Sequence, residues 1–272
     1  MNENGYRDMD PRAARRLIRE GSITFQTSGM CEGYAQANLC AVPKEYAYDF
    51  LLFAVRNPQP CPLLEVTDAG SSILRRVAPG ADVASDFPRY RVYENGVLTR
   101  EVTDARKIWR DGLVAFLIGC SFSFESALLE AGVPVRNIEE GKNVPMYLTG
   151  IPCEPAGVFR GNMVVSMRPM SPRDAIRAVE ITSAMPHVHG SPVHIGDPAA
   201  IGIKDLSRPD YGDAVEVRPG EIPVFWACGV TPQAALTASR LPFAITHAPG
   251  HMLITDIKNS DLEEFLRKGG RE

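Results

Sequence analysis

The five histidines of the chain, which could supply acid–base or metal chemistry, fall within 187–251: His187, His189, His194, His247 and His251. Imidazole changes charge near neutral pH and is the commonest metal ligand in proteins. Three of the five lie in the segment HVHGSPVHIGD (187–197), whose Gly and Pro residues are typical of a loop. Because loops on a rigid scaffold often carry functional residues, the pattern predicts a polar site. The alternative is a solvated loop with a few core histidines.

The first chemistry that this segment suggests is metal binding. His189, His194 and Asp197 are candidate ligands, because imidazole and carboxylate together suit a divalent transition metal. Their spacing matches no fixed metal motif, so we favour a metal-free acid–base set and leave a divalent metal open as a cofactor. Lys204 lies in the apolar stretch IGIK, where we expect a partly buried strand end and a lowered lysine pKa.

A second candidate region is the corner at 119–125. The apolar run 113–118 predicts a strand buried on both faces, and a helix is expected over 124–131. Cys120 and Ser121 would then lie beside a helix N-terminus, which binds anions such as a substrate carboxylate. Glu125 is a candidate acid or base. Cys120 is either a nucleophile with a lowered pKa or a small buried residue at a tight turn.

The pattern of this corner recurs about 108 residues later. Segment 222–239 aligns Cys228 with Cys120, and each copy continues through a Pro-containing strand into a second apolar strand. This order predicts two internally duplicated strand–turn–helix–strand units, and the alternative is chance similarity. A pseudo-two-fold arrangement would bring the two corners together, with Glu125 contributed by one unit and His247 by the other.

The preceding residues contain further candidates for substrate binding. Tyr34, Gln36 and Asn38 would share one face of a strand, which either lines a pocket or is exposed. Arg89 lies in a charged, loop-rich segment and could hold a carboxylate. Glu94–Gly96 predicts a hairpin turn, and helices are expected at 13–20, 43–56, 104–110, 171–183 and 261–268.

Length and composition indicate one large α+β (mixed α/β) domain over 1–272, with the two units packed around a mixed sheet. Its parts are an N-terminal region (1–110), a first unit (111–170), a His-rich connecting loop (184–213) and a second unit (214–258). The net charge of −4 gives no nucleic-acid footprint, and no apolar run is long enough to cross a bilayer. Without a secretory signal or a C-x-x-C pair, the six cysteines favour reduced thiols in the cytoplasm. A homo-oligomer is left open.

Seven segments resemble the YcsI-like family of bacterial proteins named as hydro-lyases. They are GYAQANL (33–39), NPQPC (57–61), DVASDFPRY (82–90), GCSFSFE (119–125), TGIPC (149–153), HGSPVHIGD (189–197) and HAPGHM (247–252). The resemblance covers about Arg15 to Ile257, and Glu32 departs from the small or apolar residue usual there. A related module occurs in mitochondrial D-glutamate cyclase, which closes D-glutamate to 5-oxo-D-proline with loss of water and has a further domain.

The resemblance implies a lyase that acts on a small carboxylate or amino acid. Dehydration needs an acid for the leaving oxygen and a base for the departing proton. We expect Glu125 in one role and His189, His194 or His247 in the other. Ser121, with Arg89 or Lys204, would hold a carboxylate. The alternatives are a non-catalytic carboxylate-binding module that assists a partner enzyme, and a hydrolase that uses Cys120.

Overall fold

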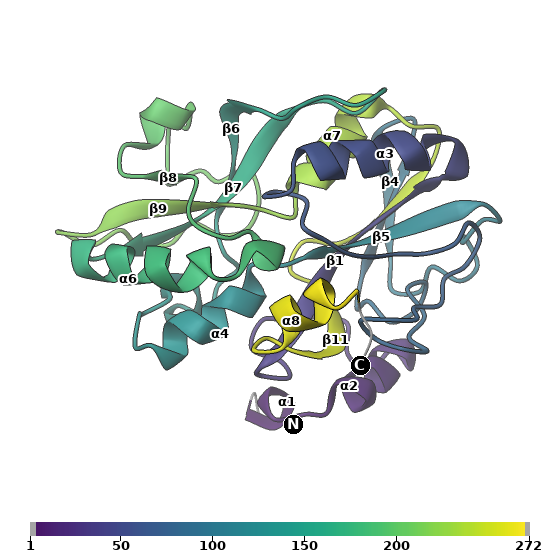
Figure 1. Ribbon diagram of the computed structural model, residues 1–272, viewed down its shortest axis with the longest axis horizontal. Coiled ribbons are helices and arrows are strands. Elements are labelled where there is room, and N and C mark those ends of the chain that lie inside the picture. The colour runs from purple at the N-terminus through teal and green to yellow at the C-terminus, as the bar shows by residue number, and fades with distance from the viewer. Residues whose placement is uncertain (1–3, 270–272) are drawn as a thin grey trace.

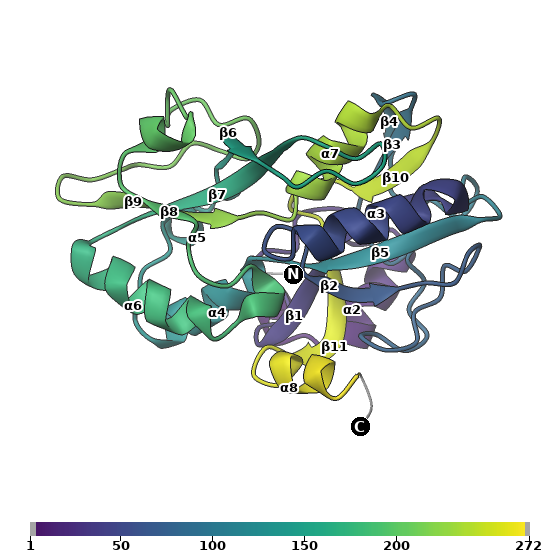
Figure 2. The same ribbon diagram turned by 45° about the horizontal axis from the view of Figure 1, so that its top comes forward.

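The computed structural model describes residues 4–269 and contains two antiparallel β-sheets with helices packed around them (Figures 1 and 2). The strands are β1 (Tyr34–Pro43), β2 (Leu63–Val66), β3 (Tyr90–Glu94), β4 (Val97–Val102), β5 (Leu113–Gly119), β6 (Met146–Pro152), β7 (Asn162–Met170), β8 (His194–Ile195), β9 (Ile222–Ala227), β10 (Ala244–His247) and β11 (Leu253–Lys258). The helices are α1 (Asn4–Arg7), α2 (Pro11–Arg19), α3 (Lys44–Arg56), α4 (Phe122–Glu130), α5 (Arg136–Glu139), α6 (Pro172–Ser183), α7 (Thr231–Ser239) and α8 (Leu262–Arg267), with short 3-10 helices η1 (Pro186–Val188) and η2 (Pro198–Ile201). This confirms the α+β class.

The larger sheet has the order β2-β5-β1-β10-β3-β4, with β11 also paired to β1, and the smaller sheet has the order β6-β7-β9-β8. Every pairing between named strands is antiparallel, so neither sheet is the mixed sheet expected. The reason is that α4 and α7 each carry the chain into the other sheet. A parallel pair requires the helix to return the chain to the sheet that it left.

The predicted element order of the two units is confirmed. The first runs β5–α4–α5–β6–β7, with the short helix α5 as an addition, and the second runs β9–α7–β10–β11. The first begins in the larger sheet and ends in the smaller one, whereas the second does the reverse. Each unit therefore crosses from one sheet to the other.

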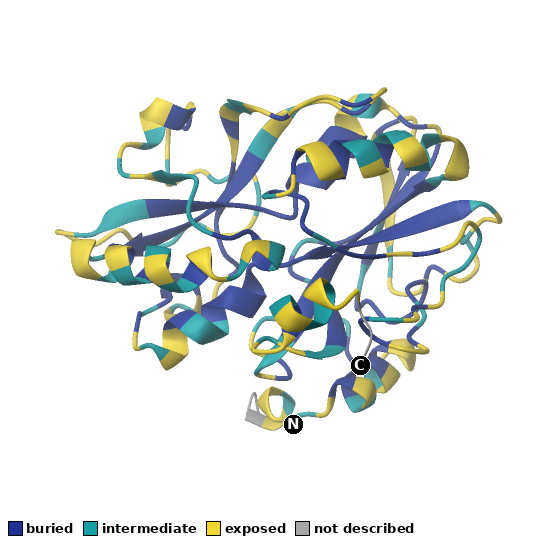
Figure 3. Cartoon of the chain, in the orientation of Figure 1, coloured by how far each residue is buried: buried dark blue, intermediate teal, exposed yellow. Residues whose placement is uncertain are grey.

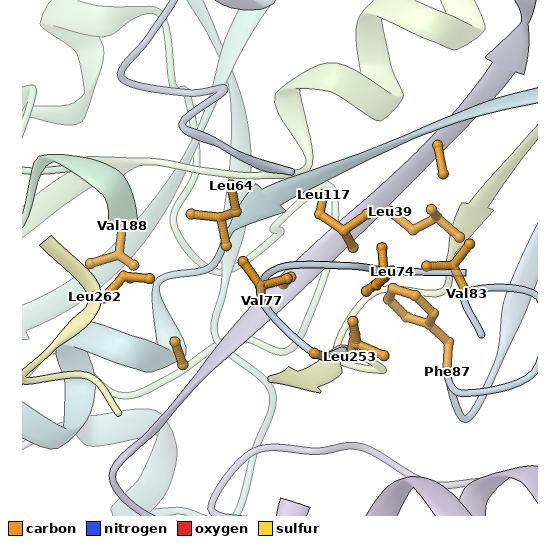
Figure 4. Close-up of a cluster of buried hydrophobic side chains, with 14 of the residues drawn as sticks. Leu39, Leu64, Leu74, Val77, Val83, Phe87, Leu117, Val188, Leu253 and Leu262 are labelled. Carbon is orange, nitrogen blue, oxygen red and sulfur yellow. The ribbon is translucent and has the colours of Figure 1, made fainter. Parts of the chain in front are cut away.

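Strand β5 is the buried strand that its apolar run predicts. Its alternate residues face opposite sides: Leu113, Ala115 and Leu117 join one hydrophobic cluster, while Phe116 and Ile118 join another. Figure 4 shows Leu117 in the first cluster near Leu39 of β1 and Phe87 of a loop. The second cluster packs α3 onto the sheet. Buried strands consequently run through the centre of the molecule (Figure 3).

Local capping explains several of the helix boundaries. The Asp10 carboxylate accepts hydrogen bonds from the N–H groups of Arg12 and Ala13, and Pro11 occupies the first turn of α2. Ser171 caps α6 in the same way, since its side chain accepts from the N–H of Asp174. The sequence predicts these two helices, α3, α8 and the β3–β4 hairpin.

The helix expected at 104–110 is wrong. The segment forms only a turn, in which Ile108 N–H and Trp109 N–H both donate to the Ala105 carbonyl. Ile108 and Trp109 then pack against the core, and the Arg110 guanidinium lies 3.4 Å from the centroid of the Phe243 ring. These tertiary contacts outweigh a weak local helix preference. No helix within residues 4–269 is both long and apolar enough to cross a membrane.

Candidate functional site

The corners that end β5 and β9 lie against each other, as the proposed pseudo-symmetry predicts. Cys120 and Cys228 belong to one buried apolar cluster, together with Phe122, Val230 and Met252. The Asn38 side chain lies between the corners: its Nδ2 donates to Gly119 O at 2.7 Å, and its amide contacts the position that a Cβ on Gly229 would occupy. Only glycine fits at Gly229 without displacing this amide.

A fully buried ion pair lies behind the first corner. Arg168 of β7 donates from Nε and Nη2 to Glu125 Oε1 at 3.0 and 2.5 Å. Its Nη1 donates to Ser166 Oγ at 2.9 Å and its Nη2 to Ser121 Oγ at 3.2 Å. The guanidinium also lies 4.8 Å from the centroid of the Phe124 ring. Glu125 and Ser121, both predicted site residues, are thus joined by an arginine from the other sheet.

Arg168 is the residue of this cluster that sequence reasoning missed. It stands alone as a charged side chain in the strand sequence NMVVSMRPM. An ionisable group in a strand expected to be buried needs a partner, and that could have singled it out. Its partner Glu125 lies 43 residues away, so local pattern could not supply the pairing.

His189 is buried near this ion pair. It follows η1 with a φ of 83°, and its Nδ1 lies 2.9 Å from Gln59 O, an arrangement in which the neutral ring donates from Nδ1. Burial lowers the pKa of His189 to about 4, and the charge of Arg168 acts in the same direction. Its Nε2 is buried without a hydrogen-bond partner. His189 is therefore a neutral, fully buried imidazole.

His247 fixes the position of β10. Leu39 N–H of β1 donates to its Nδ1 at 3.1 Å, and Gln233 Nε2 of α7 lies at the same distance from that atom. Burial lowers the pKa of His247 to about 3, so the ring is neutral at physiological pH. The imidazole connects two strands and a helix of the second unit, close to Asn38.

Two cavities adjoin α4. The inner cavity, of about 170 Å³, is lined by the predicted residues Tyr34, Gln36 and Glu125, and by Phe122 and Arg7 among others. The outer cavity, of about 540 Å³, shares a wall with it. The shared residues are Glu32, Gly33, Tyr34 and Ser126.

The strand face that carries Tyr34, Gln36 and Asn38 is not an exposed face. Gln36 and Asn38 are buried. Gln36 Nε2 donates to Thr27 O at 2.9 Å, while its Oε1 accepts from Thr27 Oγ1 at 2.8 Å. Gln36 thus holds the loop that forms one wall of the inner cavity, which agrees with the pocket alternative for this face.

Four of the predicted site residues lie elsewhere. His194 is on the edge strand β8, where its Nε2 lies 2.8 Å from Asp197 O. The Asp197 carboxylate caps η2 by accepting from Ala199 N–H.

Arg89 is 3.6 Å from Glu101 and lines a different cavity, of about 390 Å³. Lys204 is exposed and outside any strand, so the expected buried strand end is wrong. Gly202 ends η2 with a φ of 82° and turns the chain outward before Lys204.

The expected metal ligands are not assembled. His189 is buried beside Arg168, whereas His194 and Asp197 lie on the edge of the smaller sheet. Among residues 4–269, no group of three His, Cys, Asp or Glu side chains is placed to hold a metal ion.

All six cysteines are buried and free. Burial raises the pKa of the Cys120 thiol well above its ordinary value, and raises that of Cys228 to about 11. A raised pKa leaves little thiolate, the nucleophilic form, near neutral pH. The geometry therefore favours a packing role for Cys120 over a nucleophilic one.

Comparison with known proteins places the chain in a family. The family model for D-glutamate cyclase matches residues 114–256, which span both corners and the ion pair. A "Putative hydro-lyase" of Clostridium beijerinckii is 61% identical over 95% of this chain and 98% of its own. The "Putative hydro-lyase YcsI" of Bacillus subtilis is 59% identical over 93% of this chain and 99% of its own.

Among solved structures, the nitrogen repressor-like protein MJ0159 from Methanococcus jannaschii covers 89% of this chain and 97% of its own. Its TM-score of 0.39 and identity of 11% are too low to support any inference about this chain. The family match and the hydro-lyase relatives agree with each other and extend over most of the sequence. The chain belongs to the D-glutamate cyclase family.

Proposed function

We propose that this protein is a hydro-lyase that removes water from a small amino acid, in a ring closure like that of D-glutamate cyclase. The proposal rests on the position of Glu125. This residue lines the inner cavity, and Arg168 holds its carboxylate in an ion pair. The family match supports the reaction class. The buried guanidinium fixes the orientation of the carboxylate, as a proton-transfer group requires.

The chemistry of such a closure needs only proton transfer. The substrate amine attacks its own side-chain carboxyl carbon, so a C–N bond forms and a C–O bond breaks. Two protons leave the ammonium nitrogen, and both end on the departing oxygen as water. One carboxylate can relay them, and we assign this role to Glu125. Ser121 and Arg168 are positioning residues, because they hold Glu125 rather than the reacting atoms.

His189 lines neither cavity beside α4, so we assign it no contact with the substrate. Its neutral ring has an unpartnered Nε2 near Arg168, whereas both His247 nitrogens lie near Gln233. We assign His247 and Asn38 to fixing the two corners. His194, Asp197, Lys204 and Arg89 have no part in this proposal, because they line neither cavity beside α4.

The test is the Glu125→Gln variant, with D-glutamate and L-glutamate as substrates and loss of water followed by mass spectrometry. We expect at least a hundredfold loss of turnover, the usual contribution of a positioned acid–base group. Glu180→Gln on α6 is the matched control, because Glu180 is exposed and lines neither cavity. Unchanged turnover in Glu125→Gln would refute the assignment.

Binding must be measured beside turnover, because Glu125→Gln leaves a buried guanidinium with a weaker partner. Retained binding of the acid, with turnover lost, supports an enzyme. Binding by the wild-type protein without turnover of any small acid would instead indicate a carboxylate-binding module.

A further inference from the structure

The inner cavity is lined by a partly exposed ion pair that the proposed reaction does not use. Arg7 of α1 donates from Nε to Glu32 Oε2 and from Nη2 to Glu32 Oε1, each at 2.5 Å. Both residues line the inner cavity. Two backbone hydrogen bonds, from Cys31 N–H to Tyr6 O and from Glu32 N–H to Arg7 O, hold the same two segments together.

The loop that presents Glu32 has a constrained backbone. Gly29, Cys31 and Gly33 all have positive φ, of 74°, 48° and 83°. A non-glycine residue such as Cys31 rarely adopts this conformation, so the surrounding contacts must impose it. The loop is held from below by Gln36, which donates to Thr27 O and Met30 O. Glu32 is therefore positioned toward Arg7 by a stiff loop rather than by chance side-chain motion.

Among the described residues that line the inner cavity, Arg7 is the one cation. Arg168 is fully buried, and all three of its nitrogens already donate to Glu125, Ser121 or Ser166. Arg7, by contrast, keeps 58% of its side chain exposed, and within residues 4–269 its side-chain partner is Glu32 alone. A carboxylate that approaches Glu125 through this cavity would meet two negative side chains and this one guanidinium.

The Arg7–Glu32 pair has the geometry of a guanidinium that already holds a carboxylate. Two parallel N–H···O bonds are the arrangement in which arginine recognises a carboxylate from any source. An exposed pair of this kind contributes little to stability, so its exchange for an external carboxylate costs little.

Resting on the proposed function, we propose that Arg7 forms a carboxylate subsite in the wall of the inner cavity, with Glu32 occupying it until the substrate's own carboxylate takes its place. The ligand class is a small carboxylic acid, and an ammonium group on that acid would be directed toward Glu125. Glu32 lowers the affinity of Arg7 for an external carboxylate, because a ligand must displace the Glu32 side chain.

The test measures binding rather than turnover, with glutarate and D-glutamate as probes in isothermal titration calorimetry. Glu32→Gln removes the competitor and a repelling charge, so both acids should bind about two- to fivefold more tightly, as expected for loss of an exposed ion pair. Arg7→Gln removes the guanidinium, so both should bind about tenfold more weakly or worse. In the double variant, the gain from Glu32→Gln should disappear.

Opposite signs for the two single variants distinguish the subsite from a structural role. If the pair only fixed α1 on the loop, both variants would weaken binding alike and lower the melting temperature together, which would overturn the proposal. Lys258→Gln is the matched control, because Lys258 lines the outer cavity but not the inner one. A larger loss in Lys258→Gln than in Arg7→Gln would also overturn it. Failure of the proposed reaction would show differently, as absent turnover with these binding changes intact.

Discussion

At the scale of single residues, the Glu125–Arg168 pair joins α4 to β7 through two charges that are both removed from water. Removing one charge strands the other in an apolar surrounding, which costs more than removing both. Arg168 also packs against the rings of Phe124 and Trp226, so it has apolar neighbours on the side away from Glu125.

We therefore expect Arg168→Met alone to destabilise the protein by about 3–5 kcal/mol. The double variant with Glu125→Met should recover most of that loss, because the remaining side chains are apolar and of similar length. Urea unfolding of the two variants measures the difference. Equal stability of the single and double variants would mean that the ion pair is not buried as described.

The cysteine residues give a second prediction at this scale. Burial raises the pKa values of Cys120 and Cys228, so neither thiol should react readily with iodoacetamide at pH 8 in the native protein. After denaturation both should be alkylated, which mass spectrometry of the peptides detects. Rapid alkylation of Cys120 in the native state would restore it as a candidate nucleophile.

At the scale of elements, α3 is held on the larger sheet by aromatic packing. The Phe50 ring lies 4.7 Å from the Phe116 ring of β5 and 5.1 Å from the Phe159 ring, between centroids. Tyr48 on the same helix is 73% exposed. The apolar stripe of α3 was readable from the sequence, whereas its partner Phe159 was not, because that residue comes from a loop more than 100 residues away.

Phe50→Ala should destabilise the protein by about 3–5 kcal/mol, through lost burial and the cavity that remains. Tyr48→Ala should change stability by less than about 0.5 kcal/mol, as is usual for exposed positions. Thermal and urea unfolding of both variants checks the contrast. A similar loss of stability in both variants would mean that α3 does not pack on the sheet through the face that carries Phe50.

Helix α8 is joined to η1 by a titratable contact. Glu263 accepts from His187 N–H at 3.0 Å, and its Oε2 lies 2.5 Å from His187 Nδ1. Glu263 raises the pKa of His187 above its ordinary value of 6.5. A raised pKa in the folded state means that the contact stabilises fully below pH 6.5 and is lost as pH rises through the folded value.

Stability should therefore fall as pH increases above 6.5, by at most about 1 kcal/mol because both side chains are partly solvated. Glu263→Gln should remove this part of the pH dependence. Melting temperatures measured between pH 5.5 and 9 in both proteins test it. An unchanged profile in Glu263→Gln would assign the dependence to other groups.

At the scale of the whole molecule, the sequence predicted the elements better than their partners. The continuous apolar run of β5, the helical pattern of α2 and the β3–β4 turn are local signals, and all three are confirmed. The split into two sheets is not a local property, because nothing within α4 or α7 states which sheet receives the next strand. The helix predicted at 104–110 was wrong for the same reason. Its residues make tertiary contacts instead, such as that of Arg110 with Phe243, which lies far along the chain.

The candidate site shows the same division. Glu125 and Ser121 stand out because they lie where a strand turns into a helix, and Tyr34 and Gln36 of β1 line the same cavity as Glu125. Arg168 and the loop from 27 to 33 reach the same place through the fold alone. The prediction of His194 as a site residue rested on the histidine content of its segment. The structure instead pairs His194 with β9, at the edge of the smaller sheet.

The crossing of each unit between the sheets bears on how the molecule comes apart. Strand β9 supports β7, while β10 and β11, from the same unit, support β1. Truncation after residue 213 would thus strip hydrogen-bond partners from both sheets at once and should leave an insoluble fragment. The intact chain ought to melt in a single all-or-none step, with no stable half.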